Sequence, residues 1–217
     1  MQPSFWHERW RLGQIGFHQA VVEQQLAQHW PKLQVAEGDV FVPLCGKSLD
    51  LLWLRDQGLR VSGVELSAVA LELLCLEQGI LARRLPDVAF EKFEADGLRL
   101  LRGDFFDISR ELLGDARAVY DRASLIAFTP DARARYVEHM SALTRPGTKT
   151  LLITVEYAQH QMNGPPFSVS AADVAHLYSG NHTVRLLDRR DILANEARLR
   201  SRGVTELHQN CFLLTRQ

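Results

Sequence analysis

The sequence predicts an α/β fold, in which a mostly parallel, twisted sheet has helices on both faces and an antiparallel edge strand. Short apolar runs alternate with amphipathic segments of about 10 to 15 residues, a pattern typical of βαβ units. Near the C-terminus two strand-like runs flank a short helical segment, which favours a mixed sheet. The chain has 217 residues, of which 46% are hydrophobic, so we expect one globular domain with a buried core.

The first two strand–helix units are the clearest. Residues 40–42 (VFV) predict a buried strand, and residues 47–57 predict a helix that ends at Gly58. Residues 60–64 predict a second strand that leads into Glu65, and Ser67 is placed to cap the next helix.

The later elements follow with the same spacing. We expect strands at 98–101, 116–120, 148–155, 183–187 and 207–214. We expect helices at 17–30, 129–143, 170–178 and 191–200. No Ser- or Gly-rich linker divides the chain, so residues 1–217 are predicted to form a single domain, with residues 1–32 outside the strand–helix pattern.

Composition excludes several classes of protein. The 25 Lys and Arg balance 26 Asp and Glu, which disfavours a nucleic-acid partner. The three cysteines form no CxxC pair, and no metal-ligand spacing occurs, so we expect neither disulfides nor a metal. We see no signal peptide and no apolar run long enough for a membrane span, and we therefore expect a cytoplasmic location.

Ligands of parallel sheets bind beyond the carboxyl ends of the strands, so the turn after residues 40–42 is the first candidate site. Its sequence, PLCGKS, lacks the glycine that a phosphate loop needs at position 41, and it lacks a GxGxxG fingerprint. Glu65 lies 19 residues after Gly46, where a carboxylate can accept both hydroxyls of a ribose. The alternative is a solvated acid at a strand end.

Two further strand ends carry candidate residues. Asp104 and Phe105 can bind and cover an adenine, although Phe105 or its neighbour Phe106 is also a natural core residue. Arg122 follows the strand at 116–120 and can hold a carboxylate, or it can pair locally with Asp121.

Five segments together resemble thiopurine S-methyltransferases, most closely the bacterial ones. They are FWHERWRLGQIGFHQ, VFVPLCGKSLDLLWL, GVELS, YDRASLIAF and GPPF. The likeness extends from Phe5 to the closing CFLLTRQ. The usual methyltransferase loop, DxGxGxG, is absent here, as it is in the family that the chain resembles. The resemblance implies a Rossmann-like class I methyltransferase fold with S-adenosyl-L-methionine as cofactor. It also implies methyl transfer to the sulfur of a small aromatic or heterocyclic thiol, or to selenium or tellurium.

The resemblance also implies residue roles. Positions matching the family's cofactor-binding residues are Trp6, Trp10, Leu44, Glu65, Asp104, Phe105 and Arg122. Positions matching its substrate-binding residues are Phe17, Arg122 and Arg198. Residues 1–32 then provide an N-terminal lid and helix, and residues 164–167 a loop that closes the pocket. We expect no covalent nucleophile and no obligatory base, because such thiols ionise near neutral pH.

Two other functions remain open at this point. A non-catalytic S-adenosylmethionine or metabolite sensor would keep the cofactor site without an acceptor pocket, since fold alone does not decide function. An NAD-dependent dehydrogenase would share the strand-end acid, but the missing glycine fingerprint disfavours it. We expect a monomer, since no large apolar helix face stands out in the sequence.

Overall fold

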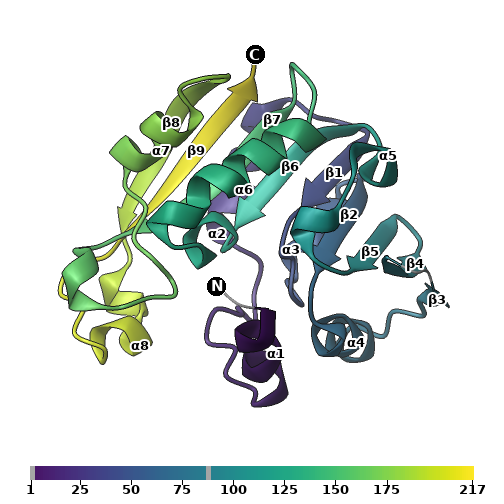
Figure 1. Cartoon of the computed structure of the whole chain (residues 1–217), viewed down its shortest axis with the longest axis horizontal. Helices are drawn as coiled ribbons and strands as arrows, with labels where there is room; N and C mark the ends of the chain where they lie inside the picture. Colours follow the sequence, from purple (N-terminus) through teal and green to yellow (C-terminus); the bar gives the residue numbers. More distant parts are fainter. Residues whose placement is uncertain (1–2, 87–88) are drawn as a thin grey trace. The chain divides into compact units, whose positions relative to one another are not determined.

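The computed structural model describes residues 3–86 and 89–217. Residues 1 and 2 of the predicted lid therefore lie outside the described residues. The chain forms two compact units, residues 1–120 and 121–217, and strand β6 (Ala116–Arg122) runs from the first into the second (Figure 1). Among the described residues, no helix has the length and apolarity that a bilayer crossing requires.

The first unit contains most of the parallel strands. Its strands besides β6 are β1 (Asp39–Val42), β2 (Arg60–Glu65), β3 (Arg83–Leu85), β4 (Glu91–Ala95) and β5 (Leu98–Arg102). Its helices are α1 (Pro3–Arg11), α2 (Gln24–His29), α3 (Asp50–Asp56), α4 (Ala68–Glu77) and α5 (Arg110–Leu113), with 3₁₀ turns η1 (Trp30–Leu33) and η2 (Phe105–Asp107).

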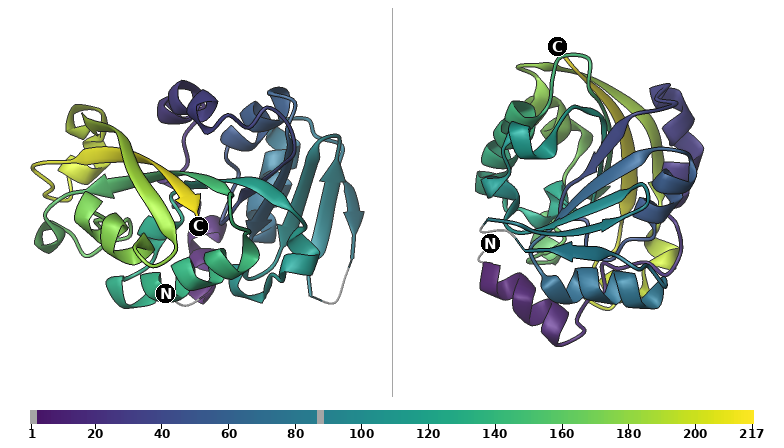
Figure 2. Two further views of the ribbon diagram at one scale, coloured as in Figure 1. Left: turned by 90° about the horizontal axis from the view of Figure 1, so that it is seen from above. Right: turned by 90° about the vertical axis from the view of Figure 1, so that its right-hand side faces the viewer.

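The strands of this unit lie in the order β3-β4-β5-β2-β1-β6 (Figure 2). Strands β5, β2, β1 and β6 are parallel, and their central members are buried along almost their whole length, as expected for parallel strands with both faces covered. Strand β4 pairs antiparallel with β5, and β3 pairs antiparallel with β4, so β3 runs in the same direction as β5. A two-residue Asp96-Gly97 turn joins β4 to β5, and Gly97 has the positive φ that such hairpins need.

The second unit has an antiparallel sheet in the order β7-β9-β8. Its elements are η3 (Leu125–Ala127), α6 (Pro130–Leu143), β7 (Lys149–Glu156), η4 (Gln159–Gln161), α7 (Ala171–Tyr178), β8 (His182–Asp191), η5 (Leu193–Asn195), α8 (Ala197–Arg200) and β9 (His208–Arg216). Helices α6 and α7 lie side by side (Figure 1). The Ser170–Asp173 capping box that opens α7 is present, with both reciprocal hydrogen bonds.

These observations confirm the α/β prediction of a mostly parallel sheet and correct some of its details. Among the described residues, four strands, β3, β4, β8 and β9, make only antiparallel pairs, where one antiparallel edge strand was expected. The helix predicted at 191–200 is wrong in extent. Strand β8 continues to Asp191, because it keeps its pairing with β9 as far as His208, and only η5 and the four-residue α8 follow.

The helix predicted at 17–30 is also wrong. Helix α2 begins only at Gln24, and the helix α1 lies earlier, at Pro3–Arg11. Glu23 caps α2 through its side chain, which accepts the backbone N–H of Gln25, while its own backbone N–H donates to Asp50 at 2.8 Å. Because the backbone N–H of Glu23 is bonded to a side chain 27 positions away, it is not bonded to the carbonyl four residues earlier, and no helix passes through Glu23 from the preceding residues. Ser67 and Thr129 occupy N-cap positions, but neither makes a side-chain capping bond.

Candidate cofactor site at the strand ends

Backbone hydrogen bonds join three strand ends of the first unit. The N–H of Cys45, just after β1, donates to the carbonyl of Val64 in β2 at 2.8 Å. The N–H of Gly103, just after β5, donates to the carbonyl of Glu65 at 3.0 Å. The carboxyl ends of β1, β2 and β5 therefore form one continuous edge, which is where open α/β sheets bind their ligands.

Glu65 lies at the centre of this edge. Its Oε2 accepts the N–H of Gly46 at 3.0 Å, and its Oε1 accepts the N–H of Ser67 at 2.8 Å. The residue is only 7% exposed, and this burial raises the pKa of its carboxyl to about 7, against the opposing effect of the backbone hydrogen bonds from Ser67, Gly46 and Leu66. Glu65 thus shapes the turn after β1, a role that its sequence position alone did not reveal.

An aromatic cluster covers the same turn. Trp10 is 4% exposed, and a Cβ added to Gly46 would lie 3.2 Å from its indole ring, so Trp10 packs directly on the turn. Phe17 lies edge-on to Trp10 at 5.5 Å and to Trp6 at 5.8 Å between ring centroids. The structure therefore brings three of the predicted residues together over the Gly46 turn, although no continuous helix carries them.

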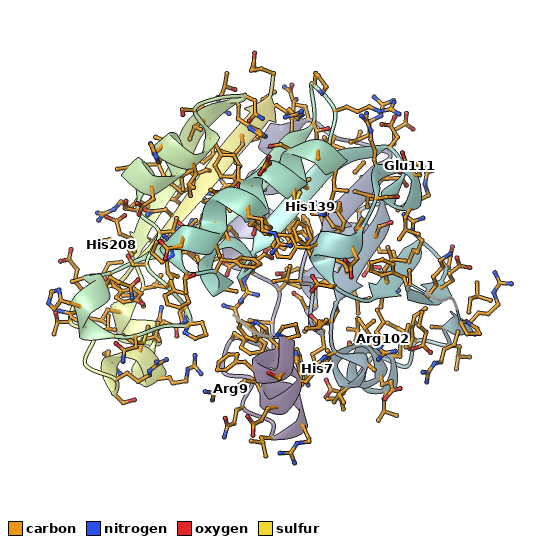
Figure 3. All side chains as sticks on the ribbon, viewed as in Figure 1. His7, Arg9, Arg102, Glu111, His139 and His208 are labelled. Carbon is orange, nitrogen blue, oxygen red and sulfur yellow. The ribbon has the colours of Figure 1, made fainter. Side chains whose placement is uncertain are left out.

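The side chain of Arg9 makes contacts within α1 and just beyond its end. The guanidinium of Arg9 lies 4.8 Å from the centroid of Phe5 and donates to Gln14 Oε1 at 2.5 Å, beyond the helix end. Figure 3 shows Arg9 and His7 on this helix. The hydrogen bond to Gln14 joins α1 to the segment that follows it.

The backbone of the turn adopts unusual conformations. Leu44 has φ +45° and Gly46 has φ +54°, values that L-residues rarely adopt and that only glycine adopts without strain. Strained residues of this kind cluster at ligand sites. Cys45, between them, is buried against Gly63, and burial followed by the charge of Glu65 raises the pKa of its thiol, so it serves as packing.

Lys47 has a structural partner. Its Nζ donates to both carboxylate oxygens of Glu77, at 2.6 and 2.8 Å, and the residue is 8% exposed. This ion pair joins the turn to the end of α4. It agrees with the rejection of a phosphate loop, in which the lysine would point at a phosphate.

Asp104 and Phe105 follow β5 at the same edge. Asp104 caps η2 by accepting the N–H of Phe106 at 2.9 Å. Phe105 is 4% exposed and stacks on Phe41 of β1 at 6.4 Å between centroids. Phe105 is therefore at least partly a core residue, whereas Phe106 is half-buried.

Arg122 and Arg198 belong to the second unit. Arg122 ends β6, next to Ala123, which has φ +65°. The neighbouring Asp121 is buried and accepts hydrogen bonds from the hydroxyl of Tyr136 at 2.7 Å and the backbone N–H of Leu125 at 3.3 Å, and burial raises its pKa to about 6. Arg198 is an exposed residue of α8.

The loop at 164–167 is tied to its own unit. The N–H of Phe167 donates to the carbonyl of Ile126 at 2.8 Å, and the Tyr157 hydroxyl donates to the carbonyl of Pro166 at 2.6 Å.

Asp50 is a residue of this region that sequence reasoning missed. It is 1% exposed, and its two oxygens accept the backbone N–H of Glu23 and the hydroxyl of Tyr120, each at 2.8 Å. It thus joins the segment after the aromatic cluster to α3 and β6. The sequence signal was an acid in the first turn of a helix, directly before the apolar run of residues 51–54.

Comparison with known proteins identifies relatives along the whole chain. The sequence matches the family described as thiopurine S-methyltransferase (TPMT) over residues 1–217. It is 46% identical to a thiopurine S-methyltransferase of Nitrosospira multiformis over 99% of this chain and 98% of the relative. It is also 46% identical to one of Pseudomonas fluorescens strain SBW25, over 99% of each chain.

Solved structures share the fold at low sequence identity. A SAM-dependent methyltransferase of Methanosarcina mazei superposes with a TM-score of 0.65 at 11% identity, over 90% of this chain and 99% of the other. A Burkholderia thailandensis 1,6-didemethyltoxoflavin-N1-methyltransferase, solved with S-adenosylhomocysteine, gives 0.61 at 16% identity, over 99% and 87%. The full-length family match and the two relatives at 46% identity show that the chain belongs to the thiopurine S-methyltransferase family, a family of S-adenosyl-L-methionine-dependent enzymes.

Proposed function

We propose that this enzyme transfers the methyl group of S-adenosyl-L-methionine to the sulfur of a small aromatic or heterocyclic thiol, with thiopurines as the model substrate. The observation that carries the proposal is the aromatic cluster of Trp6, Trp10 and Phe17 over the Gly46 turn, in a chain that matches its relatives over their full length. Selenium and tellurium compounds belong to the same proposal as alternative acceptors, because they are soft nucleophiles like thiolates.

The strand-end residues fit the cofactor. The Glu65 carboxylate has about four acceptor positions, and three backbone N–H groups stabilise it, so it retains capacity for a ribose hydroxyl. Asp104 keeps a second oxygen beyond the one that caps η2, and it is half-buried at the same edge. We assign the ribose to Glu65 and the adenine to Asp104 and Phe105, with Trp6, Trp10, Leu44 and Arg122 as further cofactor contacts.

The bound cofactor supplies a methyl group on a positively charged sulfonium, which a thiolate can take directly. The protein therefore needs to orient the two reactants and exclude water, and it needs no nucleophile of its own. Trp6 and Phe17 are half-buried aromatic rings suited to both tasks. Phe17, Arg122 and Arg198 are the proposed acceptor contacts, the two arginines serving to stabilise the negative charge of the thiolate.

We also propose that the protein acts as a cytoplasmic monomer on a small molecule, without a nucleic-acid or membrane partner. Its three cysteines are all free, as is common where thiols stay reduced. Light scattering after size-exclusion chromatography tests the monomer directly, since a dimer would double the measured mass.

Turnover with S-adenosyl-L-methionine and 6-mercaptopurine tests the reaction. We expect methylated thiopurine and S-adenosylhomocysteine in equal amounts. Truncation of residues 1–17 should leave a folded protein without transfer activity, and Arg122→Ala should lower either cofactor affinity or turnover. Cofactor binding without transfer to thiopurines, thiophenols or selenols would refute the acceptor class, and full activity after truncation would refute the lid.

A further inference from the structure

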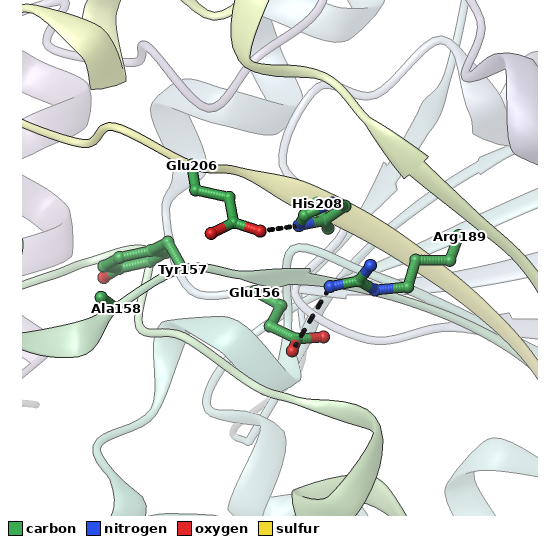
Figure 4. Close-up of a pocket in the computed structure, with 6 residues that line it drawn as sticks. All are labelled: Glu156, Tyr157, Ala158, Arg189, Glu206 and His208. Atoms are coloured by element: carbon green, nitrogen blue, oxygen red, sulfur yellow. Dashed lines mark ion pairs between the residues drawn. The ribbon is translucent and has the colours of Figure 1, made fainter.

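A pocket in the second unit was not singled out by the sequence. It has a volume of about 260 Å³ and lies where β7 ends and β9 begins. Its lining residues are Glu156, Tyr157, Ala158, Arg189, Glu206 and His208 (Figure 4). The register pairs Glu156 with His208 across β7 and β9, so both side chains leave the same face of the sheet.

Carboxylates face nitrogen-bearing side chains in two pairs around this pocket. Arg189 lies 3.7 Å from Glu156, and His208 Nδ1 lies 3.6 Å from Glu206, as the dashed lines in Figure 4 show. Both separations exceed the 2.7 to 2.9 Å typical of a charge-assisted hydrogen bond. The members of each pair are therefore neighbours without a short, direct hydrogen bond between them.

The polar groups of the pocket keep most of their bonding capacity. Within residues 3–86 and 89–217, neither the guanidinium of Arg189 nor the ring nitrogens of His208 make a hydrogen bond to another residue. His208 has a side chain only 15% exposed, so water reaches its ring poorly. Glu156 is held in place by Asn210, whose Nδ2 donates to Oε2 at 2.7 Å, and its other oxygen faces Arg189.

We propose that this pocket binds a small zwitterion that carries an ammonium and a carboxylate group, as a free amino acid does. The carboxylate would accept hydrogen bonds from Arg189 and His208, and the ammonium would donate to Glu156 and Glu206. A simple anion would be repelled by the two glutamates, and a simple cation by Arg189, whereas a zwitterion satisfies both. The pocket is smaller than a typical drug-sized site, which suits a molecule of this size.

Titration with L-alanine, monitored through the His208 ring signals in NMR spectra, tests the proposal. Propionate and ethylamine serve as probes that each lack one of the two charged groups. Saturating S-adenosylhomocysteine keeps the amino-acid part of the cofactor site filled. We expect L-alanine to bind at millimolar concentration and the two probes to bind at least about tenfold more weakly, since each loses one set of charge-assisted bonds.

A pair of arginine variants locates the binding. Arg189→Gln should weaken L-alanine binding about tenfold. Arg190→Gln is the matched control, because its guanidinium is already bonded to Asp188 at 2.7 Å and Arg190 is not among the lining residues. Equal binding of propionate and L-alanine, an unchanged affinity in Arg189→Gln, or no binding of L-alanine at millimolar concentration would each overturn the proposal.

Discussion

The protonation of Glu65 is expected to control cofactor affinity. Burial raises the pKa of this carboxyl to about 7 in the free protein. A ribose hydroxyl donates its hydrogen bond best to the carboxylate form, so only the ionised fraction binds the cofactor fully. At pH 6 that fraction is about one tenth, and the apparent dissociation constant of S-adenosylhomocysteine should therefore be about tenfold higher at pH 6 than at pH 8.

Calorimetric titration of S-adenosylhomocysteine at pH 6, 7 and 8 measures this effect. Glu65→Gln is the control, because it cannot ionise and any ionisation of the ligand cancels in the comparison. In the wild type, binding at pH 6 should also release close to one proton, which titrations in buffers of different ionisation enthalpy detect. A wild-type affinity that does not change with pH, or a slope that Glu65→Gln retains, would refute the assigned ribose contact.

The same pKa shift has a consequence for stability without cofactor. An acid whose pKa is raised by folding contributes stability that is fully present below its ordinary pKa of 4.5 and is lost as the pH rises through about 7. The shift corresponds to about 3 kcal/mol, so the free energy of unfolding should fall by about that amount over this interval, relative to Glu65→Gln. Urea denaturation at pH 4.5 and 8 measures the difference, and parallel changes in both proteins would contradict the shift.

Two other substitutions test the framework of the site. Gly46→Ala should cost about 1 to 3 kcal/mol of unfolding free energy and weaken cofactor binding, because the new methyl group meets Trp10 at 3.2 Å at a positive φ. Gly58→Ala, also at positive φ but with nothing within 4 Å, should leave cofactor affinity unchanged, and equal effects on affinity would contradict the role of the ring contact. Asp50→Ala should cost about 2 to 5 kcal/mol in urea denaturation, since it orphans a buried backbone N–H and the Tyr120 hydroxyl. Asp50→Asn should lower the free energy of unfolding by less, because the Tyr120 hydroxyl can rotate and accept a hydrogen bond from the Asn side-chain amide. An Asn variant as unstable as the Ala variant would contradict this reasoning.

Local patterns predicted most of the elements of the fold. Strands β1, β2, β5, β6 and β7 are all close to the positions predicted from their apolar runs, since strands that are buried on both faces consist of nearly continuous apolar residues. The start of α7 was predicted closely, at residue 170, and its capping box is a contact between residues only three positions apart. The β4–β5 hairpin was missed although Asp96-Gly97 is a strong hairpin signal.

By itself, the sequence determined strands β1, β2, β5, β6 and β7, the position of Glu65 at a strand end and the family likeness, because each depends on residues that are close together in the sequence. Only the tertiary structure decided which donors Glu65 accepts, and it put Trp10 on Gly46. It also decided that the helix predicted from residue 17 begins only at Gln24, because Asp50, 27 positions away in the sequence, accepts the backbone N–H of Glu23. A long-range hydrogen bond in a buried site is stronger than a local helical preference, since an unpaired buried N–H costs about 1 to 3 kcal/mol while helix propensities differ by tenths.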